Sequence, residues 1–575
     1  MGDNENRKVY EPRKVNNFRE MLEYSTTKYK DNIAYRYKKD YTAKQPEYIE
    51  KTFGQVGKDV KALSTILLNK KLEGKRVILI GNNRYEWCIS YLAITCGNMV
   101  VVPLDKALPD NEIQNLVTRS EAEIAIFDKK YIDIMKKIKE EPNSILNELI
   151  CMDNLKEEGI ENINDLLIEG QKLLEQNNTQ YEKIAINPEK MSIMLFTSGT
   201  TNEPKAVMLS QKNICSNIQD LASWVQLGTK DTMLSFLPIH HTFECTVTFL
   251  FGFYSGATIA FCDGLKYIQK NLAEYKVSVF VAVPLVLETM YKKIQKAIND
   301  QGKTKLINTM VKISKLLLKC KIDIRKKVFK QILDNFGGNL RVVFYGSAPM
   351  NKDTIIGFNN FGIDLIQGYG LTETSPVVSA ESDKEKRPGS IGLALPSLNV
   401  KISNPDENGE GEITVKGPSV MLGYYNNEEE NKKALKDGWF YTGDYGYIDK
   451  DGFIWITGRR KDIIVLRNGK NVYPQEIEFL INKLPYVKES LVYQRERNST
   501  DTMLCAKIVY DEDIIKETFG DKTEKEYKDL IFEEIKEINK TLPVFKHVKS
   551  ISITTKEFVK TTTQKVKRYE ELKNV

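Results

Sequence analysis

Short runs of consecutive apolar residues alternate along the chain with longer stretches in which apolar positions recur every three or four residues. Continuous apolar runs of this length are typical of strands buried on both faces of a parallel sheet, and the recurring pattern is typical of helices that cover such a sheet. The runs lie at residues 76–81, 98–104, 122–128, 277–284, 338–350 and 361–376. The pattern therefore predicts an α/β fold whose large N-terminal domain contains parallel-rich, helix-covered sheets.

The pattern changes after about Ser390. The following residues alternate apolar and polar positions between Asn, Asp and Gly turns, which predicts a small antiparallel β subdomain over about residues 390–457. Short strands and charged helices come next and predict a small α+β domain. We expect an N-terminal domain of residues 1–458 and a C-terminal domain of residues 459–575, with a hinge near Asp462.

Composition limits the classes of protein to consider. A chain of 575 residues exceeds what one hydrophobic core usually supports. Its 84 basic and 78 acidic residues give a net charge of only +6, so nothing in the overall charge indicates a nucleic-acid partner. The N-terminus lacks the apolar core of a signal peptide, and the most apolar run, residues 249–261, is too short to span a bilayer. Eight scattered cysteines without a CxxC pair fit a reducing compartment, so we expect a cytoplasmic protein.

One segment departs from the average charge. Residues 303–330 contain ten Lys or Arg and a single acid, Asp323. Apolar residues recur there at helical spacing, namely Leu306, Met310, Ile313, Leu317, Ile324 and Val328. A basic amphipathic helix can lie on an anionic membrane surface. The alternative is a helix that packs against its own domain and exposes a solvated basic face, and the sequence leaves both open.

A cluster of small hydroxyl and glycine residues lies in the stretch FTSGTTNEPKAVMLS, residues 196–210. Its hydroxyls and closely spaced backbone N–H groups come from Thr197, Ser198, Gly199, Thr200 and Thr201. Glycine lets the main chain approach an anion, so this arrangement predicts a phosphate-holding loop. The GxxxxGK[ST] pattern of P-loop kinases and GTPases is absent, because Lys205 is followed by Ala206.

Six further motifs follow in order: LPIHHTFE (237–244), YGSAP (345–349), QGYGLTETSP (367–376), GWFYTGDYGYID (438–449), TGRRKDIIVLRNGKNVYPQEIE (457–478) and KTTTQKVKR (560–568). With these seven motifs the chain closely resembles the adenylate-forming superfamily of acyl-CoA synthetases, adenylation domains and luciferases. The resemblance runs from about Phe18 to Arg568. It implies that ATP activates a carboxylic acid to an acyl-adenylate with release of pyrophosphate, and that the acyl group then passes to a thiol.

The resemblance also implies which residues bind the nucleotide. The loop from Thr197 to Lys205 would hold the β- and γ-phosphates, which leave as pyrophosphate. Glu373 would bind Mg²⁺ with the Thr200 hydroxyl nearby, a hard oxygen site of the kind this ion prefers. Tyr369 would stack on adenine. The full set implied for ATP or AMP is Thr197, Ser198, Gly199, Thr200, Thr201, Lys205, Gly346, Ser347, Ala348, Gln367, Gly368, Tyr369, Gly370, Thr372, Asp444, Arg459 and Lys565.

Within that set, Asp444 would accept hydrogen bonds from the ribose hydroxyls, and Arg459 would reach the ribose or the α-phosphate. Lys565 would bring positive charge to the reacting carboxylate and the α-phosphate, where preorganised charge contributes most to catalysis. The residues implied for catalysis are Lys565, His241, Glu373 and Thr200. His241 would orient the carboxylate or close the acyl tunnel, whereas we expect its neighbour His240 to be a solvated or capping residue.

The resemblance further implies a mobile C-terminal domain. After adenylation it would rotate about Asp462, so that Gly469 and Lys470 line the channel for the thiol of coenzyme A. The chain departs from the family pattern at Asn202 and Ala206 in the phosphate loop. Because Asn tolerates positive φ, we expect the loop to keep its conformation.

The residues of the motifs LPIHHTFE and KTTTQKVKR, together with the basic insert at residues 303–330, look most like those of long-chain fatty acyl-CoA synthetases. A fatty acid, ATP, Mg²⁺ and coenzyme A are therefore the expected ligands, and no obligatory protein partner is indicated. Residues 249–261 fit either an acyl tunnel or a buried strand–turn–strand. Because the sequence ends at Val575, we expect no carrier domain.

Three alternatives remain open. The acyl group could pass to an acyl carrier protein rather than to coenzyme A, and the acid could be of medium chain length or aromatic. A catalytically silent binder of fatty acid or nucleotide is the third, but the joint presence of Glu373, Asp444, Arg459 and Lys565 argues against it.

Overall fold

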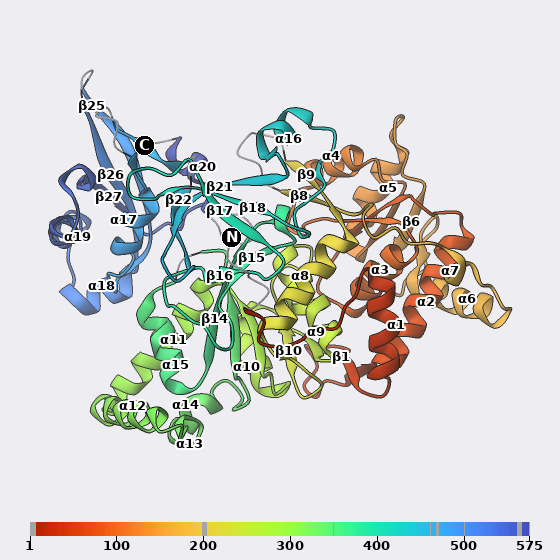
Figure 1. The fold of residues 1–575 in the computed structure, drawn as a ribbon, viewed down its shortest axis with the longest axis horizontal. Coiled ribbons are helices and arrows are strands. Elements are labelled where there is room, and N and C mark those ends of the chain that lie inside the picture. Colours follow the sequence, from red (N-terminus) through yellow and green to blue (C-terminus); the bar gives the residue numbers. More distant parts are fainter. Residues whose placement is uncertain are drawn as a thin grey trace. The chain divides into compact units, whose positions relative to one another are not determined.

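The computed structural model describes residues 7–197, 204–348, 350–459, 462–466, 471–498, 501–560 and 566–573 (Figure 1). The chain divides into two compact units. The first unit holds Met1–Val400 and Val415–Phe440, and the second holds Lys401–Thr414 and Tyr441–Val575.

The first unit contains a nine-stranded sheet in the order β16-β15-β14-β13-β12-β10-β11-β1-β2. Its strands are β1 (Ile33–Lys38), β2 (Tyr48–Thr52), β10 (Thr232–Ser235), β11 (Thr258–Phe261), β12 (Val279–Ala282), β13 (Val342–Tyr345), β14 (Asp364–Gly370), β15 (Val377–Ala380) and β16 (Leu393–Ala394). All pairs from β14 to β1 are parallel, whereas β2, β15 and β16 pair antiparallel with their neighbours at the two edges.

A second sheet of the first unit has eight strands in the order β19-β9-β8-β4-β3-β5-β6-β7. They are β3 (Arg76–Ile80), β4 (Val100–Pro103), β5 (Ile124–Phe127), β6 (Glu148–Cys151), β7 (Glu161–Asn162), β8 (Met191–Thr197), β9 (Lys205–Ser210) and β19 (Gly423–Tyr424). Its pairs from β8 to β7 are parallel, and β8, β9 and β19 pair antiparallel.

The first unit also contains helices that pack around these two sheets (Figure 1). They are α1 (Phe18–Lys28), α2 (Phe53–Asn69), α3 (Tyr85–Cys96), α4 (Asp110–Ser120), α5 (Ile132–Glu140), α6 (Ile163–Glu175), α7 (Gln180–Lys183), α8 (Gln211–Trp224), α9 (Phe251–Ser255), α10 (Ile268–Glu274), α11 (Pro284–Asp300), α12 (Thr304–Lys319), α13 (Arg325–Val328), α14 (Lys330–Asp334), α15 (Lys352–Phe361) and α16 (Glu428–Ala434). Local signals fix several of their starts: α2 begins with a capping box between Thr52 and Gln55, and Pro284 opens α11. Of the helices in the described ranges, none is both long and apolar enough to cross a membrane.

The second unit has two sheets of its own and several helices. Its strands include β22 (Ile454–Arg459), β23 (Ile464–Val465), β24 (Asn471–Val472), β25 (Val487–Asn498), β26 (Asp501–Tyr510) and β27 (Val548–Thr554), and its helices are α17 (Pro474–Ile481), α18 (Glu512–Phe519), α19 (Glu524–Lys540) and α20 (Arg568–Leu572). Strands β17 (Asn399–Ser403), β18 (Gly411–Lys416), β20 (Leu435–Lys436) and β21 (Trp439–Ile448) lie at or across the limits of the units.

The predicted fold class is confirmed. All six apolar runs form strands, from β3, β4 and β5 in one sheet to β12, β13 and β14 in the other. The β20–β21 and β21–β22 pairs are antiparallel, as expected of the small β subdomain. All eight cysteines lie in described ranges, and none forms a disulfide.

Two local predictions need correction. The strand–turn–strand alternative for residues 249–261 is wrong, because a π-helix (Glu244–Leu250) and α9 precede the single strand β11. Side chains are buried all around these helices, so no polar face marked the helical period, and Gly256 ends α9 in a left-handed conformation at φ +81°. The basic segment is helical as predicted, but it breaks after α12 at Lys321, where φ is +61°.

Candidate active site

Three of the predicted motifs meet at one edge of the nine-stranded sheet. Strands β10, β13 and β14 run parallel, so the loops at their carboxyl ends lie along the same edge. A Cβ on Gly346 would lie 2.7 Å from the carbonyl oxygen of Gly368 and 3.8 Å from the ring of Phe243. The turn after β13 therefore touches the end of strand β14, with the loop of His241 beside it.

Backbone conformation in this slot is tightly constrained. Ser347 has φ +74°, a left-handed conformation that a residue with a side chain rarely adopts and that is often found at binding sites. A Cβ on Gly370 would come within 1.9 Å of the carbonyl oxygen of Pro376, so only glycine fits there. Ala348 directly follows Ser347, and Thr372 opens a short 3₁₀ turn after β14.

The side chains around the predicted adenine slot differ in burial. Gln367 is buried, and its Oε1 accepts a hydrogen bond of 2.8 Å from the Tyr345 hydroxyl. Its backbone N–H donates to Glu381. Gln367 thus holds β13 and β14 together, whereas Tyr369 is half-buried at the end of β14.

The end of the phosphate loop lies next to Glu373. Thr197 and Lys205 are opposite each other in the β8–β9 pair, on either side of residues 198–203. The Lys205 ammonium forms an ion pair with Glu430 and lies 5.1 Å from the ring centroid of Tyr424. The Tyr424 hydroxyl donates a 2.9 Å hydrogen bond to Glu373 Oε1. One tyrosine therefore connects Lys205 with the predicted metal ligand.

Tyr424 and Glu430 were missed in the sequence. Tyr424 reaches the site because β19 pairs with β9, placing it opposite Val207. Local residue spacing cannot predict that β19 pairs with β9, because the two segments are far apart in the sequence. The residues GYY after a glycine turn do indicate a strand. Burial raises the pKa of the Tyr424 hydroxyl well above its ordinary value, so it remains a hydrogen-bond donor to Glu373.

The oxygen ligands that Glu373 offers are suited to a magnesium ion. Its carboxylate is a hard oxygen ligand, partly exposed, with one oxygen oriented by Tyr424. No group of three or more His, Cys, Asp or Glu is placed to hold a metal in the described part of the chain. Mg²⁺ needs no such group, because it is usually bound by one or two carboxylates together with phosphate oxygens and water.

The loop after β10 carries the two neighbouring histidines. Nδ1 of His241 accepts a 3.3 Å hydrogen bond from the backbone N–H of Phe243. Of the two roles expected for His240, the solvated one is wrong, because its side chain is only 16% exposed and lies 3.7 Å from Asp105. Burial lowers the pKa of His240 to about 4, so the ring is neutral at pH 7.

The same segment ends in a buried acid. Glu244 begins the π-helix and has no exposed surface, and one of its oxygens accepts from the Thr248 hydroxyl at 3.0 Å. Burial raises the pKa of Glu244 to about 8. The carboxyl group is therefore largely protonated at neutral pH.

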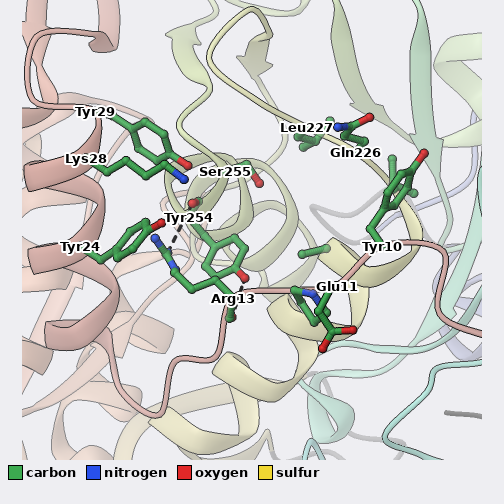
Figure 2. A pocket seen from close by; sticks show the side chains of 13 residues that line it. Tyr10, Glu11, Arg13, Tyr24, Lys28, Tyr29, Gln226, Leu227, Tyr254 and Ser255 are labelled. Atoms are coloured by element: carbon green, nitrogen blue, oxygen red, sulfur yellow. Dashed lines mark hydrogen bonds between the residues drawn. The ribbon is translucent and has the colours of Figure 1, made fainter.

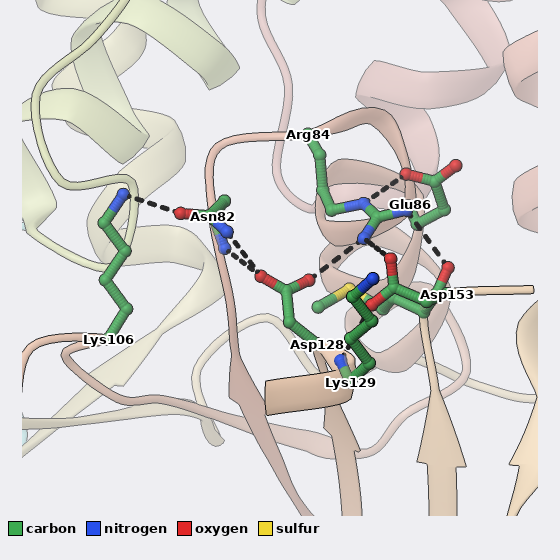
Figure 3. Close-up of polar contacts among 8 residues, drawn as sticks. Asn82, Arg84, Glu86, Lys106, Asp128, Lys129 and Asp153 are labelled. Carbon is green, nitrogen blue, oxygen red and sulfur yellow. Dashed lines mark hydrogen bonds and ion pairs between the residues drawn. The ribbon is translucent and has the colours of Figure 1, made fainter. Parts of the chain in front are cut away.

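Asn83 ties the histidine loop to the eight-stranded sheet. Its amide donates to Ser235 Oγ at 2.9 Å and to the carbonyl oxygen of Leu237 at 2.7 Å. The neighbouring residues are fixed by the network in Figure 3, in which Asp128 accepts hydrogen bonds from Asn82 and from Arg84. The loop of His241 is thus held from both sheets.

Two of the predicted nucleotide ligands meet in the second unit. Asp444 and Arg459 are directly opposite each other in the β21–β22 pair, and Arg459 Nε lies 2.9 Å from Asp444 Oδ1. The aspartate is almost fully buried. Elsewhere in this unit, Asp462 accepts a 2.7 Å hydrogen bond from the Gln475 amide.

The last motif is anchored on both sides of residues 561–565. Lys560 forms an ion pair with Glu489, and Arg568 forms one of 2.8 Å with Glu478. Seven of the predicted site residues lie outside the described residues, namely Ser198, Gly199, Thr200, Thr201, Gly469, Lys470 and Lys565.

A cleft of about 340 Å³ lies elsewhere in the first unit (Figure 2). Arg13 is stacked there between Tyr24 and Tyr254, at 3.8 and 4.2 Å from the ring centroids. Of the described residues predicted to bind nucleotide, none lines this cleft. Its walls come from residues 10–13, from α1 and Tyr29, from the end of α8 with residues 225–227, and from Tyr254 and Ser255 of α9.

Comparison with known families identifies the class of this protein. The profile of the AMP-binding enzyme family matches residues 22–425, and that of the AMP-binding enzyme C-terminal domain matches residues 461–574. The chain belongs to the AMP-binding enzyme family. The resemblance inferred from the seven motifs is therefore confirmed.

Named relatives of this AMP-binding enzyme are fatty acid ligases. It is 28% identical to the long-chain-fatty-acid–CoA ligase FadD15 of Mycobacterium tuberculosis over 459 residues, which is 77% of this chain and 74% of that one. It is also 28% identical to the long-chain-fatty-acid–CoA ligase 5 of Rattus norvegicus over 564 residues, covering 90% and 82% of the two chains.

Solved structures share the fold. MatB from Rhodopseudomonas palustris with bound ATP superimposes with a TM-score of 0.73 at 22% identity, covering 97% of this chain and 99% of that one. A fatty acyl CoA synthetase from Mycobacterium tuberculosis gives a TM-score of 0.65 at 21% identity, covering 97% and 98%.

Proposed function

We propose that this protein is a long-chain fatty acid:CoA ligase, which forms an acyl-adenylate from a fatty acid and ATP and then transfers the acyl group to coenzyme A. The AMP-binding enzyme family to which it belongs comprises ATP-dependent acid–CoA ligases among its members, and the named relatives are fatty acid–CoA ligases. The observation that carries the proposal is the arrangement of Lys205, Tyr424 and Glu373 at the end of the phosphate loop.

In this proposal Lys205 exchanges its partner when ATP binds. The ammonium leaves Glu430 for the β- or γ-phosphate, and Glu373, oriented by Tyr424, would hold Mg²⁺. The ion would neutralise the phosphate oxygens and so favour the departure of pyrophosphate. Thr197, Ser198, Gly199, Thr200 and Thr201 supply the remaining donors. The ATP-bound MatB, and a structure of MenE from Bacillus subtilis with ATP and magnesium, support nucleotide and metal as ligands of this fold.

The slot beside them is proposed to take adenine and the acid. Tyr369 stacks on the base beside the close contact between Gly346 and Gly368. His241, on a loop held from both sheets, orients the carboxylate for attack on the α-phosphorus. Since the loop is fixed by Asn83, the ring needs little reorganisation when the acid enters.

The remaining roles are proposed for the second unit. Asp444 accepts from the ribose hydroxyls, and Arg459, now paired with it, moves to the ribose or the α-phosphate. Lys565 supplies the positive charge at the reacting centre. The C-terminal domain, residues 459–575, then turns about Asp462, and Gly469 and Lys470 line the path of coenzyme A.

The test is acid-dependent exchange between ATP and pyrophosphate with a panel of acids from hexanoic to eicosanoic. We expect exchange to be strongest with long chains and to yield a thioester once coenzyme A is added. Strong exchange with short or aromatic acids would contradict the long-chain assignment. Exchange without thioester formation would point to a carrier-protein thiol, and exchange with none of the acids would exclude the enzymatic reading.

We also propose that the enzyme works in the cytoplasm in peripheral contact with an anionic membrane. A long-chain acid partitions into lipid, so contact with a bilayer would bring the enzyme to its substrate. The eight unpaired cysteines fit a reducing compartment.

A further inference from the structure

Helix α12 has an inner face that belongs to the protein core. Ile307, Met310 and Val311 pack against the hydrophobic cluster between the nine-stranded sheet and its helices, and Ser314 on the same side is buried. The helix lies beside α11 and α15 in the first unit (Figure 1). Its position and orientation are therefore fixed by packing.

The outer face of the same helix is also apolar. Leu306, Ile313 and Leu316 are 53%, 41% and 64% exposed. With about 100° between successive helix positions, these three side chains fall within roughly 80° of one another and form a single stripe. Ile322, just after the helix, is 52% exposed as well. Thr309, which is also exposed, lies in the same sector between Leu306 and Ile313. Single exposed apolar residues are common on protein surfaces, but three in one sector of a helix indicate a binding surface.

Lysines border this stripe on one side. Lys305, Lys312, Lys315 and Lys319 are exposed and follow the apolar row around the helix. Within the described ranges none of the four forms an ion pair. The one acid of the segment, Asp323, is paired with Arg325 at 2.7 Å and leaves their charge uncompensated.

We propose that the α12 ridge, formed by Leu306, Ile313, Leu316, Lys305, Lys312, Lys315 and Lys319, docks the enzyme on an anionic lipid bilayer. A helix with an apolar row beside a cationic row is suited to the plane between lipid headgroups and acyl chains. Each lysine near an anionic membrane contributes about a fivefold factor to partitioning. Because the inner face already holds the helix in place, docking needs no folding of the segment.

The charge pattern favours lipid over the other anionic partners. A nucleic acid would use the lysines but would leave the apolar row in water. A bilayer satisfies both rows at once. That the ridge serves delivery of a fatty acid rests on the proposed ligase activity; that it binds anionic lipid does not.

The experiment is cosedimentation of the full-length protein with vesicles of phosphatidylcholine, with and without phosphatidylglycerol. Two double variants remove one row each: Lys312→Gln with Lys315→Gln, and Leu306→Ser with Leu316→Ser. Matched controls are Lys137→Gln with Lys139→Gln on α5, and Ile168→Ser on α6, where Ile168 is 55% exposed. All these positions are on the surface, and thermal unfolding checks that every variant is folded.

The wild type should bind the anionic vesicles, and added salt should weaken that binding because exposed charges are screened. The lysine variant should lose about 25-fold in partitioning, from two fivefold factors. The leucine variant should lose about tenfold, since it removes most of the apolar row. Both controls should stay within about twofold.

Binding that is equal on neutral and anionic vesicles would overturn the proposal, as would controls that lose as much as the ridge variants. Loss in the lysine variant with none in the leucine variant would indicate a purely electrostatic anion surface, which also contradicts docking into the bilayer. A wild-type enzyme active in ATP–pyrophosphate exchange that ignores vesicles refutes the ridge alone. Vesicle binding without exchange for any acid refutes the ligase alone.

Discussion

The hydroxyl of Tyr424 offers a sharp test of the proposed phosphate and metal site. Tyr424→Phe removes one oxygen and with it the 2.9 Å hydrogen bond to Glu373. A hydrogen bond to a buried charged group contributes about 1.5 to 3 kcal/mol, and because Glu373 is partly exposed we take a smaller value of about 1 to 2 kcal/mol. If Glu373 acts in the adenylation transition state, kcat/KM for exchange should fall about 5- to 30-fold.

The assay is ATP–pyrophosphate exchange with a saturating fatty acid, repeated over a range of Mg²⁺ concentrations. The variant should need more Mg²⁺ to reach half of its maximum rate, because its carboxylate is no longer oriented. Tyr425→Phe is the matched control: the next tyrosine also donates to a carboxylate, Glu121, at 2.9 Å, but away from Glu373. Unchanged exchange and unchanged Mg²⁺ dependence in Tyr424→Phe would refute the reasoning, as would an equal loss in the control.

Four further predictions concern neighbouring features. Glu430→Gln removes the carboxylate that competes with phosphate for Lys205, so KM for ATP should fall about two- to fivefold in exchange assays; a rise would contradict the partner exchange. Gly346→Ala places a Cβ 2.7 Å from the Gly368 carbonyl oxygen, so we expect about 1 to 3 kcal/mol lower stability in denaturant titrations and a raised KM for ATP; full stability would show that the turn after β13 can move away from β14 at no cost. The pKa of Glu244 is raised to about 8 from an ordinary 4.5, so between these pH values the folded protein keeps a proton that the unfolded chain has lost, and stability falls as the pH rises from 4.5 to 8. Glu244→Gln should therefore flatten the dependence of Tm on pH in that range. An unaltered slope would contradict the raised pKa. Asp462→Pro should reduce thioester formation more than exchange, and equal loss of both would argue against a hinge there.

Much of the fold could be read from apolar runs because buried parallel strands leave a signal that is local in the sequence. The run at residues 122–128, for example, contains β5, in which every residue is buried. The turn of Gly346 was equally legible, since glycine appears where two backbones touch. The helices at residues 244–255 were not, because burial on all sides removed the polar face that reveals a helical period.

The partners of the site residues were beyond the reach of spacing arguments. The ion pair between Glu430 and Lys205 and the hydrogen bond from Tyr424 to Glu373 form only when β19 pairs with β9. That α12 has both a buried and an exposed apolar face could not be predicted, for a different reason. Its sequence shows apolar residues at helical spacing, but which of them face the core depends on where α11 and α15 lie.

Asn83 limits how this sequence can diverge. Its side-chain amide donates to Ser235 at the end of β10 and to the carbonyl oxygen of Leu237 in the loop that follows. A change at position 83 or 235 alone therefore leaves a partly buried polar group without this partner, at a cost of about 1 to 3 kcal/mol. The loops after β3 and β10 must therefore co-evolve. In a set of relatives, positions 83 and 235 should vary as a pair, even though 152 positions separate them along the chain.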